Sequence, residues 1–122
     1  MNDETYKITV FDNYILMEFF AELDVPTIET ASKVGLELSK EKNIKRMCCD
    51  ISKSSYNGIT MALQVAGIRM LWSIRHFERL AMIISDPEMQ KIVRSTMAQV
   101  HMTDKYRSFP DKESAVAWLE EK

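Results

Sequence analysis

Segments typical of strands alternate with segments typical of helices through most of this chain, and this alternation limits the folds that it can adopt. After residue 20 the order is helix, strand, helix, strand, helix, strand, helix. Strands separated by helices pair in parallel through right-handed crossovers. The strand-like runs in this part are KRMCCDIS (45–52), RLAMIIS (79–85) and KYRSF (105–109).

Two β-rich runs, YKITVF (6–11) and YILMEFF (14–20), precede the alternation. Asp12 and Asn13 separate them, and both residue types tolerate the positive φ of a tight turn, which predicts a β-hairpin. A chain of 122 residues has the usual size of one domain. We therefore predict a single α/β domain over residues 1–122, with a mixed, mostly parallel five-stranded sheet, an N-terminal hairpin and about four helices.

End signals and apolar spacing define the predicted helices. Pro26 opens the first helix, and Asp86 with Pro87 is typical of the cap and first turn of another. A further helix is predicted over 59–76 from its apolar spacing. The last lies in PDKESAVAWLEEK (110–122), and its inward-facing residues are expected to be Ala115, Trp118 and Leu119.

Cys48 and Cys49 are the only cysteines of the chain. Neighbouring residues in a strand point to opposite faces of the sheet, so the two thiols cannot act as a CxxC pair. We interpret both as small buried core residues, because free cysteine is among the most buried residue types. Neither histidine stands in a ligand-spaced motif, so we expect no metal site, no cofactor and no disulfide framework, which fits a cytoplasmic protein.

The charge pattern bears on the partners. The formal net charge is -2, and the basic residues are scattered rather than gathered in one block. Nucleic acid is therefore not expected as a partner. No apolar run approaches the ~20 residues that span a bilayer, so no transmembrane segment is expected.

Polar residues follow two of the predicted parallel strands where these strands end. The carboxyl edge of an open α/β sheet is where ligands bind, with helix N-termini supplying N–H donors. This edge is our candidate site for an anion or a phosphorylated hydroxyl. The alternative is that Asp86 and one hydroxyl or amide of the first loop only cap helices. The candidate ligand or regulatory loop residues are Asp50, Ser52, Ser54, Ser55, Ser85 and Asp86.

The predicted helix over 59–76 carries two apolar stripes on opposite sides, whereas a surface helix needs only one. A homodimer is the commonest way to cover the second stripe, and an apolar ligand or peripheral contact with a membrane surface is the alternative. A further possibility is that the helix breaks near Gly67 and both stripes are core. The second stripe and its polar neighbours are Met61, Val65, Ile68, Arg69, Trp72 and His76.

Two segments, FERLAMIISD (77–86) and RSFPDKESAVAWLEEK (107–122), together with the order of elements, resemble the SpoIIAA-like family of the STAS superfamily. The resemblance implies a small α/β domain with a central mixed sheet, also likened to the lipid-binding SEC14 fold. In STAS anti-sigma-factor antagonists, a partner kinase phosphorylates a serine in a DSSG-like turn at a helix start. The corresponding place here reads SSYNG (54–58), with Tyr56 and Asn57 where the paired serines would be.

These observations predict a non-enzymatic cytoplasmic regulatory or protein-interaction module that forms a homodimer and binds through residues 59–76 and the loop before them. An apolar small-molecule or lipid-binding protein is the alternative, with the second stripe lining the pocket. A small enzyme using Asp50, Ser52 and Asp86 is less favoured, because a serine nucleophile needs an activating base and neither histidine is near in sequence.

Overall fold

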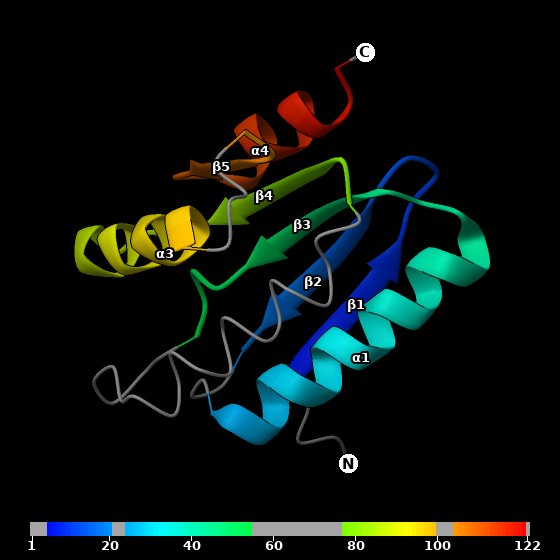
Figure 1. The fold of residues 1–122 in the computed structure, drawn as a ribbon, viewed down its shortest axis with the longest axis horizontal. Coiled ribbons are helices and arrows are strands. Elements are labelled where there is room, and N and C mark those ends of the chain that lie inside the picture. Colours follow the sequence, from blue (N-terminus) through cyan, green and yellow to red (C-terminus); the bar gives the residue numbers. More distant parts are fainter. Residues whose placement is uncertain (1–4, 21–23, 55–76, 100–103, 122) are drawn as a thin grey trace.

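The structure, a computed structural model, describes residues 5–20, 24–54, 77–99 and 104–121. Its strands form one five-stranded sheet in which the spatial order β1-β2-β3-β4-β5 is also the order along the chain (Figure 1). The predicted α/β class and the five-stranded mixed sheet are confirmed. The elements are β1 (Tyr6–Val10), β2 (Ile15–Phe19), α1 (Val25–Lys42), β3 (Arg46–Asp50), β4 (Arg79–Ile83), α3 (Pro87–Gln99), β5 (Tyr106–Phe109) and α4 (Lys112–Leu119).

The N-terminal hairpin supplies the antiparallel edge of the sheet, as predicted. β1 pairs antiparallel with β2, and every later pair of neighbouring strands is parallel. The Phe11 N–H donates to the Tyr14 carbonyl at 2.9 Å and closes the two-residue turn between the strands. Neither Asp12 nor Asn13 adopts the positive φ that the dipeptide suggested. Among the described non-glycine residues only Asn43, at the end of α1, has a positive φ.

Local signals explain where α1 begins and ends. The Asp24 carboxylate accepts a hydrogen bond from the Thr27 N–H at 2.8 Å, and the helix stops at Asn43, which has φ 55°. Gly35 lets the helix approach the sheet closely. A Cβ placed on Gly35 would lie 2.7 Å from the terminal methyl group of Met17 in β2.

The sheet is covered on both faces, which gives two apolar clusters. The cluster on one face includes Ala31 of α1 and Met89 of α3, and the cluster on the other includes Ala115 of α4. Cys49 belongs to the first cluster and Cys48 to the second, so the two thiols point to opposite faces as predicted. Ala115, Trp118 and Leu119 are all buried, so the predicted inward face of α4 is confirmed.

Two arginines hold the C-terminal end of α4 against the sheet. Arg79 donates to the Trp118 carbonyl at 2.6 Å, and Arg46 donates to the Leu119 and Glu121 carbonyls. The guanidinium groups of Arg79 and Arg107 also lie over the Trp118 ring, 5.3 and 5.1 Å from its centroid. These charged donors add to the backbone hydrogen bonds at the C-terminal end of the helix, where a positive charge is favourable.

The helix predicted over 59–76 lies outside the described residues. Within the residues that the structure does describe, no helix is both long enough and apolar enough to cross a membrane.

Candidate functional site

The carboxyl ends of β2, β3 and β4 lie side by side, and the chain leaves β3 there through a short polar segment, residues 51–54, called the β3 loop below. Asp50, the last residue of β3, is buried, and one of its carboxylate oxygens shapes this loop. One carboxylate oxygen, Oδ1, accepts from the Ser52 backbone N–H at 2.9 Å and from the Ser52 hydroxyl at 2.6 Å. Asp50 and Ser52, two of the predicted site residues, therefore contact each other in an Asx turn.

Ser54 completes the loop by bonding back to Ile51. Its hydroxyl donates to the Ile51 carbonyl at 2.7 Å, and its backbone N–H approaches the same oxygen at 3.2 Å. Ile51 in turn donates its N–H to the Ile83 carbonyl of β4 at 3.1 Å. The loop is thus fixed to the edge of the sheet by backbone as well as side-chain hydrogen bonds.

A partly buried ion pair at this edge was not predicted from the sequence. Glu18 stands in β2 directly beside Asp50 in β3 and is 8% exposed. Lys53 of the β3 loop places its ammonium nitrogen 3.3 Å from Glu18 Oε2 and 5.7 Å from the centre of the Phe20 ring. The only local signal in the sequence is the Glu18 carboxylate inside the apolar run YILMEFF. Its partner Lys53 lies 35 residues further along the chain, so local patterns could not predict the pair.

Ser85 and Asp86 follow β4 at the same edge, and the structure places Asp86 at the start of α3. Asp86 Oδ1 accepts from the Glu88 N–H at 3.1 Å, and the Asp86 carbonyl accepts from the Gln90 N–H at 3.0 Å. This arrangement agrees with the helix-cap alternative for Asp86. The Ser85 side chain is exposed.

The remaining predicted site residues cannot be placed, because they fall outside the described residues. This applies to the serine after the β3 loop and to the whole second apolar stripe. These residues are Ser55, Met61, Val65, Ile68, Arg69, Trp72 and His76.

The two thiols are buried and stay protonated under ordinary conditions. Burial, reinforced by the negative charge of Asp50, raises the pKa of Cys48 to about 12. Burial also raises the pKa of Cys49, which is fully enclosed in the other cluster. Because the thiolate is the nucleophilic form, neither cysteine is suited to nucleophilic or redox chemistry.

Solved structures show what this arrangement of strands and helices resembles. The chain aligns with unphosphorylated SpoIIAA, an anti-sigma-factor antagonist, at 14% identity and a TM-score of 0.59, over 93% of this chain and 95% of that one. It aligns with the Bacillus cell-fate determinant SpoIIAA in its phosphorylated form at 11% identity and a TM-score of 0.60, over 94% and 99%. A DUF3478-family protein with a SpoIIAA-like fold from Shewanella loihica PV-4 aligns at 17% identity and a TM-score of 0.62, over 98% of both chains.

This chain has the SpoIIAA-like fold. The sequence itself matches no family model, and no curated protein matches it significantly. At these identities the structural agreement establishes the SpoIIAA-like arrangement of the sheet and helices, which confirms the fold expected from the resemblance.

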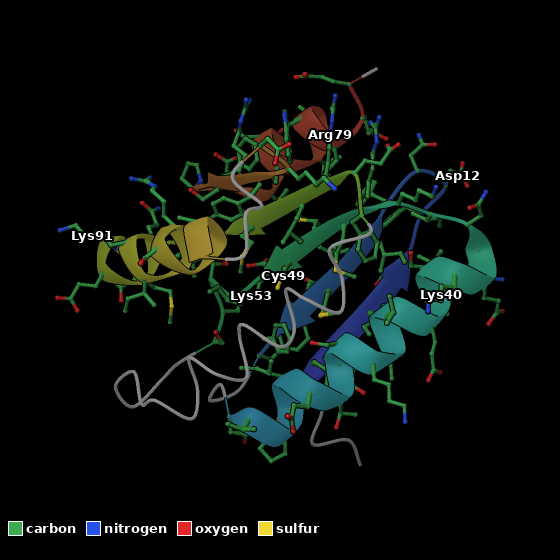
Figure 2. All side chains as sticks on the ribbon, in the orientation of Figure 1. Asp12, Lys40, Cys49, Lys53, Arg79 and Lys91 are labelled. Carbon is green, nitrogen blue, oxygen red and sulfur yellow. The ribbon has the colours of Figure 1, made fainter. Side chains whose placement is uncertain are left out.

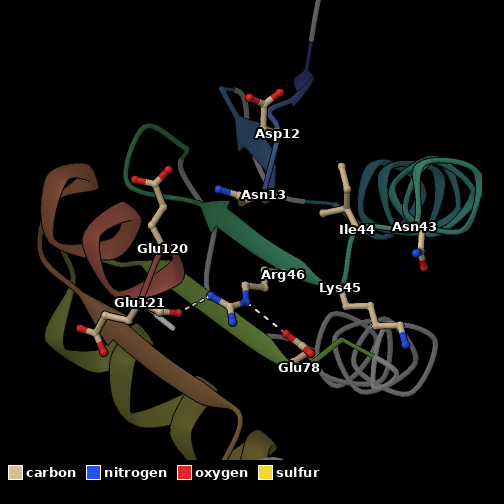
Figure 3. A pocket seen from close by; sticks show the side chains of 9 residues that line it. All are labelled: Asp12, Asn13, Asn43, Ile44, Lys45, Arg46, Glu78, Glu120 and Glu121. Carbon is tan, nitrogen blue, oxygen red and sulfur yellow. Dashed lines mark hydrogen bonds and ion pairs between the residues drawn. The ribbon is translucent and has the colours of Figure 1, made fainter.

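The SpoIIAA-like sheet of this chain also carries a polar pocket of about 540 Å³ at the opposite edge, where β3 and β4 begin (Figure 3). The hairpin turn at Asp12, the connection between α1 and β3, and the end of α4 surround it. Arg46 lies in its wall and is held by Glu78 at 3.1 Å and by the Leu119 and Glu121 carbonyls. No local pattern in the sequence predicts this pocket, because its lining comes from four separate places in the chain.

Proposed function

We propose that the chain is a non-enzymatic regulatory module that binds a protein partner, and that the β3 loop forms part of the binding surface. The observation that carries this proposal is the organisation of the loop around Asp50. A buried carboxylate fixes the loop from within and leaves an ordered polar surface at the carboxyl edge of the sheet. This edge is where open α/β sheets bind their ligands.

The loop geometry favours binding over catalysis. The Ser52 hydroxyl and the Ser52 backbone N–H bond to the same oxygen of Asp50, and the Ser54 hydroxyl bonds to a main-chain carbonyl. Both hydroxyls therefore serve local structure, in the manner of Asx and Ser/Thr turns. A serine nucleophile would instead need an activating base that is itself oriented by a third group.

The comparisons support the regulatory half of the proposal. SpoIIAA, whose fold this chain shares, is an anti-sigma-factor antagonist and exists in unphosphorylated and phosphorylated forms. A phosphate on Ser54 would add negative charge close to the buried Asp50 and Glu18 carboxylates, where Lys53 supplies positive charge. We expect such a charge to disturb the loop and to weaken partner binding.

Site-specific photocrosslinking in the cells that make this protein tests the proposal. A photoreactive phenylalanine analogue at Ser85, which is exposed at the carboxyl edge, should form a discrete protein adduct. The same analogue at Asp12, which is exposed in the hairpin turn at the opposite edge, should form none. Ser54→Asp should lower the yield of the Ser85 adduct. Equal labelling from both positions, or no adduct from Ser85, would contradict the proposed surface.

We further propose a homodimer through residues 59–76, as the sequence predicts, although this segment lies outside the described residues. Sedimentation of the wild-type chain and of Trp72→Glu tests it. We expect the wild-type chain to sediment as a dimer and the variant as a monomer. A wild-type monomer at high concentration would remove the proposal. The apolar-ligand alternative depends on the same residues and stays a prediction.

A further inference from the structure

Lys53 joins the β3 loop to β2 through an ion pair between side chains, whereas the other described bonds of the loop are hydrogen bonds within the loop or to β4. Among the described residues, the hydrogen bonds of Ser52 and Ser54 end within residues 50–54. Ile51 bonds to β4 through its backbone. Lys53 reaches across to β2, where its ammonium nitrogen lies 3.3 Å from Glu18 Oε2.

The Glu18 carboxylate needs this cation more than an exposed carboxylate would. It lies in the sheet beside Asp50, and both residues are buried, with 8% and 3% of their surfaces exposed. Two carboxylates on neighbouring strands repel each other, and burial removes much of the water that would screen them. Asp50 is engaged with Ser52, so Lys53 is the cation that compensates Glu18 among the described ion pairs.

Lys53 can hold the loop and still be reached from outside. Its side chain is 57% exposed, and its ammonium group also lies 5.7 Å from the centre of the half-exposed Phe20 ring. Figure 2 shows Lys53 at the end of the sheet where the chain leaves β3. The stem of the side chain therefore bridges the loop and β2, and its charged end lies at the surface.

We infer that Lys53 is the positioning residue of the β3 loop: its ion pair with Glu18 fixes the loop in the conformation that the partner binds. The loop-fixing half of this inference stands on the described contacts alone, and the partner-binding half rests on the proposed function. Neutralising either member of the pair should release the loop and weaken partner binding through the same change in structure.

Amide hydrogen exchange of Ser52 and Ser54 tests the first half without any partner. Lys53→Met should make these two amides exchange roughly three- to fivefold faster, as expected for loss of a partly exposed ion pair that closes a local opening. Lys53→Arg should restore protection to within about twofold of the wild type, because the charge and reach are kept. Lys91→Met, which removes an exposed lysine from α3, is the matched control and should leave both amides unchanged.

Global unfolding in urea, measured on the same variants, separates local opening from a general loss of stability. If the two loop amides accelerate no more in Lys53→Met than the amides of β3 do, the ion pair does not position the loop and the inference fails. Unchanged exchange in Lys53→Met would overturn it as well.

The Ser85 photocrosslink tests the second half. A positioning role predicts that Glu18→Gln and Lys53→Met lower the adduct yield equally, although Glu18→Gln leaves the lysine charge in place. If Lys53 instead contacts the partner directly, Glu18→Gln will leave the yield unchanged or raise it, and the inference fails. Absence of the wild-type adduct contradicts the proposed function, whereas the exchange result decides the loop-fixing half independently.

Discussion

Alkaline pH should destabilise this protein through its two buried thiols, by an amount that can be worked out from the structure. Cys48 and Cys49 are 0% and 1% exposed. Burial raises the pKa of Cys48 from 9.0 to about 12, with a further contribution from Asp50, and burial raises the pKa of Cys49 as well. Both thiols therefore stay protonated in the folded chain at pH 10, while most thiols in the unfolded chain have lost their proton.

The sign and size follow from proton linkage. The folded state binds more protons than the unfolded state, so the stabilisation is fully present below pH 9 and is lost as the pH rises towards the folded-state pKa. As the pH rises from 7 to 10, each thiol should lower the free energy of unfolding by about 1.4 kcal/mol, and the pair should lower it by about 3 kcal/mol. This free-energy difference depends only on the pKa of the thiols in the unfolded state, because pH 10 lies below the folded-state pKa of both residues.

Urea unfolding at pH 7 and pH 10, under reducing conditions, measures the effect. The control is the double variant Cys48→Ala, Cys49→Ala, in which the lost packing lowers stability equally at both pH values. Its loss of unfolding free energy between the two pH values should be smaller than that of the wild type by about 3 kcal/mol. If the two proteins lose the same amount, the thiols are not held protonated in the fold and the reasoning is wrong.

Two further predictions concern the helices. Trp118 packs in the apolar cluster that includes Ala115 of α4, beneath Arg79 and Arg107. Trp118→Ala should therefore lower the free energy of unfolding, measured in urea, by about 3–5 kcal/mol. A loss below about 1 kcal/mol would contradict this packing. Asp24→Ala should cost about 1 kcal/mol at pH 7, because the cap on Thr27 is lost, whereas Asp24→Asn should retain most of it. Hydrogen bonds from the Thr27 side chain and backbone lower the pKa of Asp24 below its usual value of 3.8. The ionised cap therefore stabilises the fold above pH 3.8, and this stabilisation is lost as the pH falls through the lowered pKa. If the stability deficit of Asp24→Ala persists unchanged in acid, this reasoning is wrong.

Local patterns in the sequence predicted most of the described fold. The hairpin was recognisable because two β-rich runs flank Asp12 and Asn13, and α4 because Ala115, Trp118 and Leu119 recur at helical spacing. The opposite orientation of Cys48 and Cys49 followed from the period of two in a strand. Each of these inferences needs only residues that are close together in the sequence.

The contacts that define the carboxyl edge could be predicted only in part. Asp50 and Ser52 are two residues apart, and their association follows from the turn chemistry of aspartate. Glu18 and Lys53 meet only because β2 and β3 pair in one register, and a shift by one residue would turn Glu18 to the other face of the sheet. The pocket around Arg46 likewise depends on tertiary packing, which periodicity does not encode.

The order of the strands has a consequence for how the chain reaches its native state. Each strand pairs with the strand that comes before it in the sequence, so the sheet extends in one direction from the hairpin. Apart from the hairpin, each pairing closes a single crossover connection between consecutive strands, so no pairing has to close a longer loop at a higher entropic cost. The pairing of β1, β2 and β3 involves no residue after Asp50, so these three strands can pair during translation, before β4 is synthesised.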